Sequence, residues 1–191
     1  MKRITAIVAL MLCMCMVSEA KLVLSSLCSD GMVLQQNDNA TVWGTADPGS
    51  QITVTPSWSG RSYSAKAGKD GRWTVKVATP QGSYKAYTMT VKGNGETIRI
   101  KDILVGEVWL ASGQSNMEMP MRGFYNCPVE DALEYISAPA ATEKIRMFTV
   151  PVKQSYEPLS EVDSRWQGAE SSTIPDMSAT AYFFARKLNE T

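Results

Sequence analysis

The residue best suited to nucleophilic chemistry is Ser115, which lies between two side-chain amides in the run Leu110-Ala111-Ser112-Gly113-Gln114-Ser115-Asn116-Met117. Strand-forming residues at 103–110 precede this run. A serine at the end of a buried strand has a fixed backbone, and the turn after it can aim N–H groups at a developing oxyanion. The same residues could instead form a polar turn, so Ser115 is a candidate that the rest of the chain must support.

The chain contains no histidine among its 191 residues. A serine or cysteine nucleophile that works with an imidazole base needs one. Either the chemistry is different, or this chain is not a whole enzyme. Its 19 basic residues balance 19 acidic ones, so nucleic acid is not an expected partner. No cluster of cysteine or histidine has the spacing of metal ligands.

The first twenty residues have the layout of a secretory signal peptide. Lys2-Arg3 is basic, residues 4–17 are almost wholly apolar, and Ser18-Glu19-Ala20 fits cleavage after Ala20. The apolar run is shorter than the roughly twenty residues that span a bilayer, although an uncleaved anchor or a buried strand is the alternative. We therefore expect a secreted or periplasmic protein with no stable membrane anchor after cleavage.

Two cysteines, Cys28 and Cys127, follow the predicted cleavage site. Export makes a disulfide between them chemically possible, but their separation does not establish one. Cys28 lies among apolar neighbours, as is typical of a small core residue. Cys127 lies in a turn-like stretch, and their pairing stays open.

Residues 21–101 are predicted to form a β-sandwich, because short alternating runs are separated by turns and show no helical period. The turn signals are Asp47-Pro48-Gly49, Asp70-Gly71 and Asn94-Gly95. The Asp-Gly pair is also a hairpin signal. Trp43 and Trp73 could stack on a sugar, but their alternation with polar neighbours favours core positions.

The pattern changes at residue 102. Residues 103–110 are nearly continuously apolar, as expected of a strand buried on both faces. A helix at 129–136, a second strand at 145–150 and a helix from Asp176 or Ser178 follow. The residues predicted to share one face of that last helix are Ala181, Phe184, Ala185 and Leu188.

Strand, helix, strand and helix are the beginning of an α/β domain, but they close no core by themselves. We therefore expect the chain to stop early. The predicted fold class is α+β multidomain, with a signal peptide at 1–20, a β-sandwich at 21–101 and the truncated beginning of an α/β domain at 102–191.

Several runs resemble the sialate O-acetylesterase family, in the right order over most of residues 28–188. They are Ser29-Asp30-Gly31-Met32-Val33-Leu34-Gln35, Val42-Trp43-Gly44, Asp47-Pro48-Gly49, Asp70-Gly71-Arg72-Trp73, Val105 to Met117, and Ala179-Thr180-Ala181-Tyr182-Phe183-Phe184-Ala185-Arg186. The most specific is Val105 to Met117. The resemblance implies a secreted carbohydrate esterase of the SGNH-hydrolase type, which removes O-acetyl groups from sialic acids or other glycans.

The resemblance also implies that Ser115 is the nucleophile, that its backbone N–H is an oxyanion donor, and that no metal or other cofactor is needed. Gln114 and Asn116 would orient the loop or bind near the acyl oxygen. The family's catalytic histidine and its carboxylate partner (an aspartate) come from the C-terminal part of the fold. Neither has a matching position in this sequence, so both roles stay unassigned.

Other residues near Ser115 have two interpretations each. Arg122 could meet the carboxylate of a sialic acid or be a solvated loop residue. Glu118 is close to Ser115 in sequence, but its side chain need not point toward Ser115. Met117, Met119 and Met121 could line an acetyl pocket or fill space between domains.

Three hypotheses remain. The first is a truncated carbohydrate O-acetylesterase that acts on an O-acetylated sialic acid or another acetylated glycan, lacks its base and is inactive alone. The alternative is a non-catalytic exported β-sandwich module that binds a glycan or a protein. The third is a fragment without a function.

Overall fold

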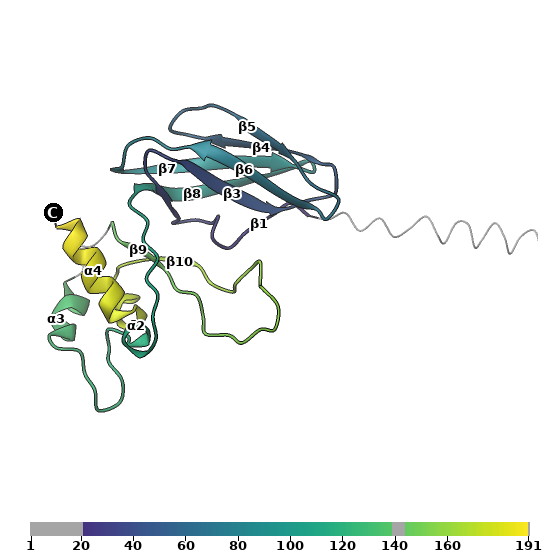
Figure 1. Cartoon of the computed structure of the whole chain (residues 1–191). Coiled ribbons are helices and arrows are strands. Elements are labelled where there is room, and N and C mark those ends of the chain that lie inside the picture. Colours follow the sequence, from purple (N-terminus) through teal and green to yellow (C-terminus); the bar gives the residue numbers. More distant parts are fainter. Residues whose placement is uncertain (1–20, 139–143, 191) are drawn as a thin grey trace, which may run out of the picture.

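The computed structural model describes residues 21–138 and 144–190, so the predicted signal peptide at 1–20 lies outside the described residues. The described chain is mostly β-sheet with few helices. Figure 1 shows a layered β-unit above a smaller region that contains the helices. None of the helices within the described ranges is long and apolar enough to cross a membrane.

Eight strands between Val23 and Gly106 form two sheets in the described chain. They are β1 (Val23–Leu24), β2 (Val33–Gln35), β3 (Asn39–Thr45), β4 (Gln51–Pro56), β5 (Tyr63–Lys66), β6 (Arg72–Ala78), β7 (Ser83–Gly93) and β8 (Glu96–Gly106). One sheet has the order β1-β3-β6 and the other β2-β8-β7-β4-β5. Strand β2 pairs with β8 in parallel, and the other pairs are antiparallel.

A common hydrophobic core is shared by the two sheets. Along β6, Trp73, Val75 and Val77 are buried while the residues between them are exposed, which confirms the predicted alternation. Trp73 is a core residue and Trp43 is partly buried against the core. Cys28 is buried there too, and desolvation raises the pKa of its thiol to about 11. Cys28 and the exposed Cys127 are both free thiols.

The predicted turns are present, but one of them connects differently. Gly49 has φ +82° after Pro48, and Asn94 and Gly95 have φ 52° and 72° in the hairpin between β7 and β8. The Asp70-Gly71 turn, however, is not a hairpin, because β5 pairs in one sheet and β6 in the other. The turn is closed by Gly71 N–H donating to Gly68 O at 3.0 Å, and the chain changes sheets there.

The predicted strand at 103–110 is wrong beyond Gly106. Ile103, Leu104 and Val105 are buried in β8, whereas residues 107–110 have no strand partner in the described chain and are exposed. The predicted domain boundary between residues 101 and 102 falls inside β8. Asp102 has φ 53° there, next to a register irregularity between β7 and β8, and such a bulge redirects a side chain.

The smaller region contains short elements after Gly106. They are α2 (Ser115–Glu118), α3 (Ala132–Ser137), β9 (Arg146–Phe148), β10 (Trp166–Gly168), the 3-10 turn η2 (Ile174–Asp176) and α4 (Ala179–Asn189). Strands β9 and β10 form a two-stranded antiparallel sheet. A second, small core is made by Met121, Ile145, Ala169, Ile174, Met177, Ala179 and Tyr182. The beginning of an α/β domain at 102–191 stays a prediction.

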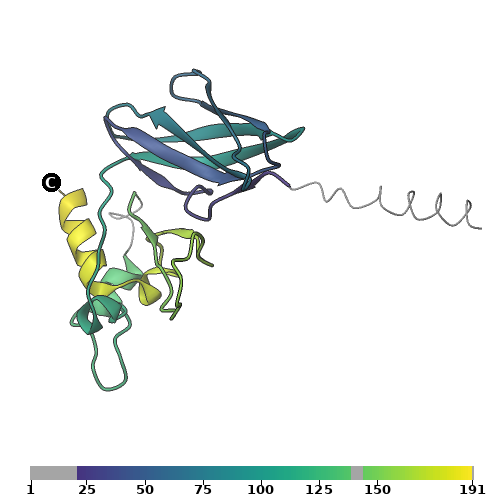
Figure 2. The ribbon, with the colours of Figure 1, turned by 45° about the vertical axis from the view of Figure 1, so that its right-hand side comes forward.

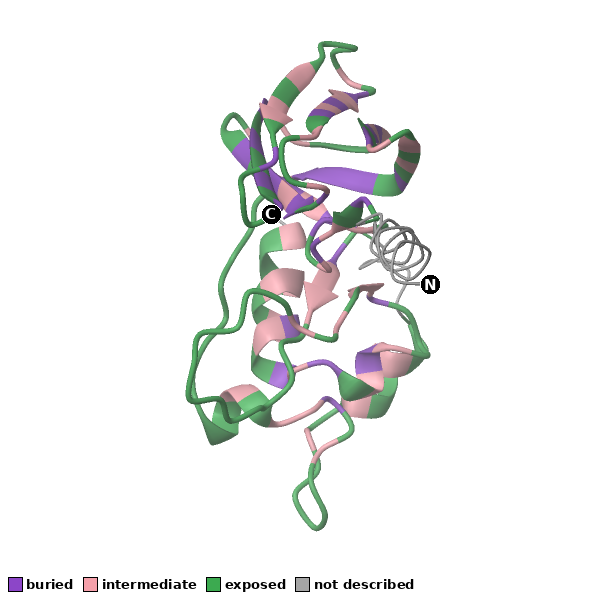
Figure 3. Cartoon of the chain, turned by 90° about the vertical axis from the view of Figure 1, so that its right-hand side faces the viewer, coloured by how far each residue is buried: buried purple, intermediate pink, exposed green. Residues whose placement is uncertain are grey.

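Helix α4 does not bury the whole of the face that Ala181, Phe184, Ala185 and Leu188 were predicted to share. Tyr182 is 0% exposed in the second core, whereas Phe184 is 45% and Leu188 is 43% exposed. The apolar residues of this helix extend around more than one side, so periodicity alone did not identify the side that packs. Figure 3 shows that the buried segments concentrate in the sandwich, with fewer in the smaller region.

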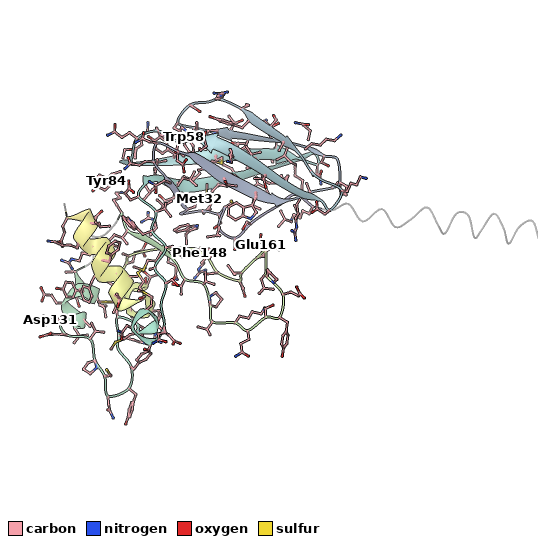
Figure 4. The ribbon with its side chains drawn as sticks, viewed as in Figure 1. Met32, Trp58, Tyr84, Asp131, Phe148 and Glu161 are labelled. Atoms are coloured by element: carbon pink, nitrogen blue, oxygen red, sulfur yellow. The ribbon has the colours of Figure 1, made fainter. Side chains whose placement is uncertain are left out.

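Polar contacts join the two regions. Glu161, on the loop between β9 and β10, accepts from Ser25 Oγ at 3.0 Å and Ser26 N–H at 3.1 Å. Figure 4 shows Glu161 where this loop faces the sandwich. Trp166 Nε1 donates to Leu27 O at 2.9 Å. Arg146 pairs with Asp102 at 3.0 Å, so the bulged residue of β8 contacts β9.

Candidate active site

Ser115 is the first residue of α2, a single helical turn, and its side chain is exposed. The carbonyl of Gln114 accepts from Met117 N–H at 2.9 Å and from Glu118 N–H at 3.0 Å, and Ser115 O accepts from Met119 N–H at 3.0 Å. These bonds close the turn around Ser115. The Gln114 side chain makes no capping bond. Within the described residues, the first N–H groups of the turn have no backbone partner, as is usual at a helix start.

The N-terminus of α4 holds this turn from outside. Thr180 Oγ1 donates to Asn116 O at 3.0 Å, and Ala179 N–H donates to Met119 O at 2.8 Å. Ser178, the N-cap of α4, accepts from Ala181 N–H and also contacts Met117 Sδ at 3.6 Å. Figure 1 shows α2 beside the lower end of α4. The chain directly after Ser115 is therefore held by contacts with residues about 60 positions later.

The chain after α2 also contacts the segment that leads into α4. Met121 N–H donates to Met177 O at 2.9 Å, and Met121 is 0% exposed in the second core. Met121 is therefore a packing residue and not the wall of an open acetyl pocket. Met117 and Met119 are half-buried.

The segment that leads to Ser115 begins at an anchor on β2. Glu107 accepts from Gln36 Nε2 at 2.6 Å and from Gln35 Nε2 at 3.2 Å. Val108 N–H donates to Gln35 Oε1 at 2.9 Å. The bonds from Gln36 and then Gln35 lower the pKa of Glu107 from its ordinary value, because they stabilise the carboxylate. The runs ending at Gln35 and beginning at Val105 thus meet in space.

Of two charged residues near Ser115 in sequence, Arg122 is paired with another group. Arg122 forms an ion pair with Asp176, and its backbone N–H donates to Pro175 O at 3.0 Å. Glu118, the last residue of α2, is exposed. The ion pair with Asp176 joins the loop after α2 to η2.

Within the described part of the chain, the Ser115 hydroxyl has no side-chain hydrogen-bond partner. No side chain of residues 21–138 or 144–190 exchanges a hydrogen bond with Ser115 Oγ, and the sequence has no histidine. Two hollows in the described surface, one at residues 163–167 and one between the 24–30 loop and β8, do not include Ser115. Within the same residues, no group of three metal-ligating side chains is present.

The structure thus brings the turn that contains Ser115 into contact with the start of α4. Sequence reasoning did not assign a role to Ser178 or Thr180. The available signal was a serine directly before an apolar helical run, which is typical of an N-cap. Their contact with α2 could not be read from the sequence, because it joins distant segments.

No protein-family model matches the chain. Curated relatives do. The chain is 32% identical over 176 residues to a sialate O-acetylesterase of Mus musculus, a match that covers 84% of this chain and 32% of that protein. It is 32% identical over 184 residues to a sialate O-acetylesterase of Homo sapiens, with 87% and 34% coverage.

A solved structure agrees with these relatives. A carbohydrate acetylesterase from Xanthomonas citri superposes with a TM-score of 0.79 at 31% identity, over 89% of this chain and 38% of that one. The chain therefore spans about a third of the length of the curated relatives that it matches.

Proposed function

Because the chain is homologous to part of the sialate O-acetylesterases, we propose that it carries the nucleophile of a carbohydrate O-acetylesterase. The observation that carries the proposal is the position of Ser115. It is an exposed serine at the first residue of a turn whose backbone is held by α4. A fixed backbone with an accessible hydroxyl is what a serine nucleophile requires.

The proposed reaction has two halves. Ser115 Oγ attacks the acetyl carbonyl while a base takes its proton, and the tetrahedral intermediate collapses with transfer of that proton to the leaving sugar alkoxide. Water, deprotonated by the same base, then attacks the acetyl-serine and releases acetate and free Ser115. No metal or other cofactor enters this scheme.

The neighbours of Ser115 support the oxyanion in this proposal. The backbone N–H of Ser115 lies at the start of α2, where N–H groups lack intrahelical acceptors. It is the proposed oxyanion donor. Asn116 holds the turn through its carbonyl bond with Thr180, and Gln114 closes the turn through its own carbonyl. Their side-chain amides are the proposed contacts near the acyl oxygen.

The base has to come from outside these 191 residues, since they include no histidine. We propose that the 191-residue chain does not turn over substrate alone. Removing the base of a serine hydrolase costs on the order of 10⁶-fold in kcat in a measured case.

The proposed substrate is an O-acetylated sialic acid or another acetylated glycan. The proposed location is secreted or periplasmic, after cleavage of residues 1–20 behind Ala20. The proposed location rests on the residue pattern alone. It is tested separately, by N-terminal sequencing of the exported protein.

The test is acetate release from an O-acetylated sialoglycan by this chain joined to the part of a relative that lies outside the match. Ser115→Ala should abolish release, because no other group attacks the carbonyl. Ser112→Ala, in the same exposed run, is the matched control and should retain activity. Undiminished release by the Ser115→Ala protein would remove Ser115 from its role. Glycan binding without release in every such protein would favour the non-catalytic module.

A further inference from the structure

Two aromatic side chains are exposed at the end of the loop between α2 and α3. We call Phe124, Tyr125 and Asn126 the aromatic tip. Tyr125 is 94% exposed and Phe124 is 47% exposed. Figure 2 shows this loop projecting from the smaller region, on the side away from the sandwich. Neighbouring exposed rings of this kind are enriched where proteins bind other molecules.

The backbone that carries the aromatic tip is fixed. Phe124 N–H donates to Cys127 O at 3.0 Å, and Cys127 N–H donates to Phe124 O at 3.0 Å. Tyr125 and Asn126 therefore form the turn of a tight hairpin, with Asn126 at φ 57°. At Gly123, a Cβ atom would lie 2.5 Å from Cys127 O, so only glycine lets the two arms of the loop come this close. A fixed tip binds a ligand without the entropy cost of ordering a loop.

The base of this loop contacts the segment that also holds the turn of Ser115. Met121 N–H donates to Met177 O at 2.9 Å, and Arg122 N–H donates to Pro175 O at 3.0 Å. The N-terminus of α4, which follows directly, bonds to the α2 turn. The aromatic tip begins nine residues after Ser115, on a loop held by the same neighbours. A chain of several sugars can therefore contact both.

The aromatic tip is too small for a stable protein partner. Two aromatic rings supply about 150–250 Å² each when they are buried, whereas a stable protein–protein interface buries about 800 Å² on each partner. A second copy of this chain would gain too little area from the tip. A sugar ring is close in size to one aromatic ring, so the tip is large enough to cover it.

The side chains of the tip also have the chemistry of a sugar site. Residues 123–129 include no charged side chain, which favours a neutral, hydroxyl-rich ligand. The apolar C–H face of a pyranose ring packs on an aromatic face. The Tyr125 hydroxyl and the Asn126 amide supply donors and acceptors for sugar hydroxyls.

We propose that the aromatic tip binds a neutral sugar that flanks the acetylated sugar of the substrate, so that Tyr125 selects oligosaccharides over esters without flanking sugars. This inference rests on the proposed function for the position of the acetyl group at Ser115. Binding at the tip itself needs neither Ser115 nor a base. Its contribution is to hold the glycan without touching the reacting carbonyl.

The first test measures binding by the 191-residue chain itself. The probes are sialyllactose, which joins a sialic acid to two neutral sugars, and a xylo-oligosaccharide. NMR titration should show saturable shifts of the Tyr125 ring and the Asn126 amide with at least one of them. Free sialic acid, which has no flanking sugar, should not shift these signals.

Variants decide whether the ring carries this binding. Tyr125→Ala should weaken it by roughly tenfold, as the loss of an aromatic anchor does. Tyr125→Phe should bind nearly as tightly, because the ring face remains. Tyr156→Ala is the matched control, since Tyr156 is a fully exposed tyrosine on the loop between β9 and β10, and it should bind like the unaltered chain.

Three results would overturn the inference. They are the absence of saturable binding of both oligosaccharides, equal binding by the Tyr125→Ala chain and the unaltered chain, and a dimer of the chain that Tyr125→Ala dissociates. The last result would favour a second copy as the occupant of the tip.

The second test separates this site from the proposed function. It uses the chain joined to the unmatched part of a relative. Tyr125→Ala should raise KM for the O-acetylated sialoglycan by roughly tenfold and keep kcat within about twofold. Hydrolysis of nitrophenyl acetate should not change, because this ester has no flanking sugar. Tyr125-dependent binding without acetate release would keep the sugar site and reject the proposed function. Acetate release with an unchanged KM in Tyr125→Ala would do the reverse.

Discussion

Residues 22–106 and residues 107–190 bury their apolar side chains very differently. The two sheets share one continuous core, whereas the second core of the smaller region has seven buried residues, including Tyr182. Among described residues, three of the exposed large apolar side chains lie before residue 107 and twelve lie after it. The sandwich thus completes its own core, and the region that carries Ser115 leaves apolar surface open. The larger core and the exposed Ser115 therefore lie in different parts of the chain.

The largest expected effect is a loss of stability in the sandwich. Ile52 is 0% exposed, and Ile52→Ala should lower the free energy of unfolding by about 2–5 kcal/mol, because it removes buried methyl groups and leaves a cavity. Leu133→Ala removes a similar side chain that is 80% exposed on α3, and it should change stability by about 0.5 kcal/mol or less. Urea denaturation followed by circular dichroism measures both. Equal losses would remove the contrast between the regions.

A smaller and local effect is expected from Met121→Ala in the second core. Met121 is 0% exposed, and truncation should lower the opening free energy of α2 and α4 by about 2 kcal/mol, at the low end for this substitution because the small region can relax. Hydrogen exchange should show faster amides at 117–122 and 179–186. Amides of β3 and β6 should keep their protection. Equal acceleration there would mean that the two regions open as one unit.

A smaller loss of stability is expected when a contact between the two regions is removed. Trp166→Phe removes the Nε1 bond to Leu27 O, and we expect a loss of about 1 kcal/mol. Limited proteolysis of the exposed 151–165 loop should become faster, because that loop is held against the sandwich beside Trp166. Trp58→Phe is the matched control. It removes an Nε1 bond to Ala78 O within the sandwich and should leave loop cleavage unchanged. Faster cleavage in both proteins would argue against a specific joint.

The smallest expected effect concerns pH. The folded pKa of Glu107 lies below its ordinary value of about 4.5, because Gln36 and Gln35 donate to the carboxylate. The stabilising contribution is therefore complete above 4.5 and is lost as pH falls through the depressed folded pKa. NMR titration should show the Val108 amide shifting over that range. In Glu107→Gln, the shift should disappear, and an unchanged titration would assign it to another group.

Much of the sandwich was predictable because its signals are local. The alternation of Trp73, Val75 and Val77 follows from the period of a strand, and the φ of Gly49 follows from a turn after Pro48. Which strands the Asp70-Gly71 turn connects could not be predicted from local signals. The same turn chemistry can join two strands of one sheet or two strands of different sheets.

The candidate site shows the same contrast between local and distant signals. Ser115 was proposed from its local run, but the bonds of Ser178 and Thr180 to the α2 turn join residues about 60 positions apart. The predicted apolar face of α4 includes Phe184 and Leu188, which are exposed. Apolar residues occur around this helix, and only the position of the second core selects Tyr182 over Phe184.

By itself, the sequence determined the short strands, their turns, the absence of histidine and the serine worth examining. These depend on residue type and on neighbours a few positions away. Only the tertiary structure decided that the strand before Ser115 ends at Gly106, that α4 contacts the α2 turn and that Trp109 meets Phe184. Those outcomes depend on which distant segments reach each other, because burial and hydrogen bonding are set by the partners that fold against a residue.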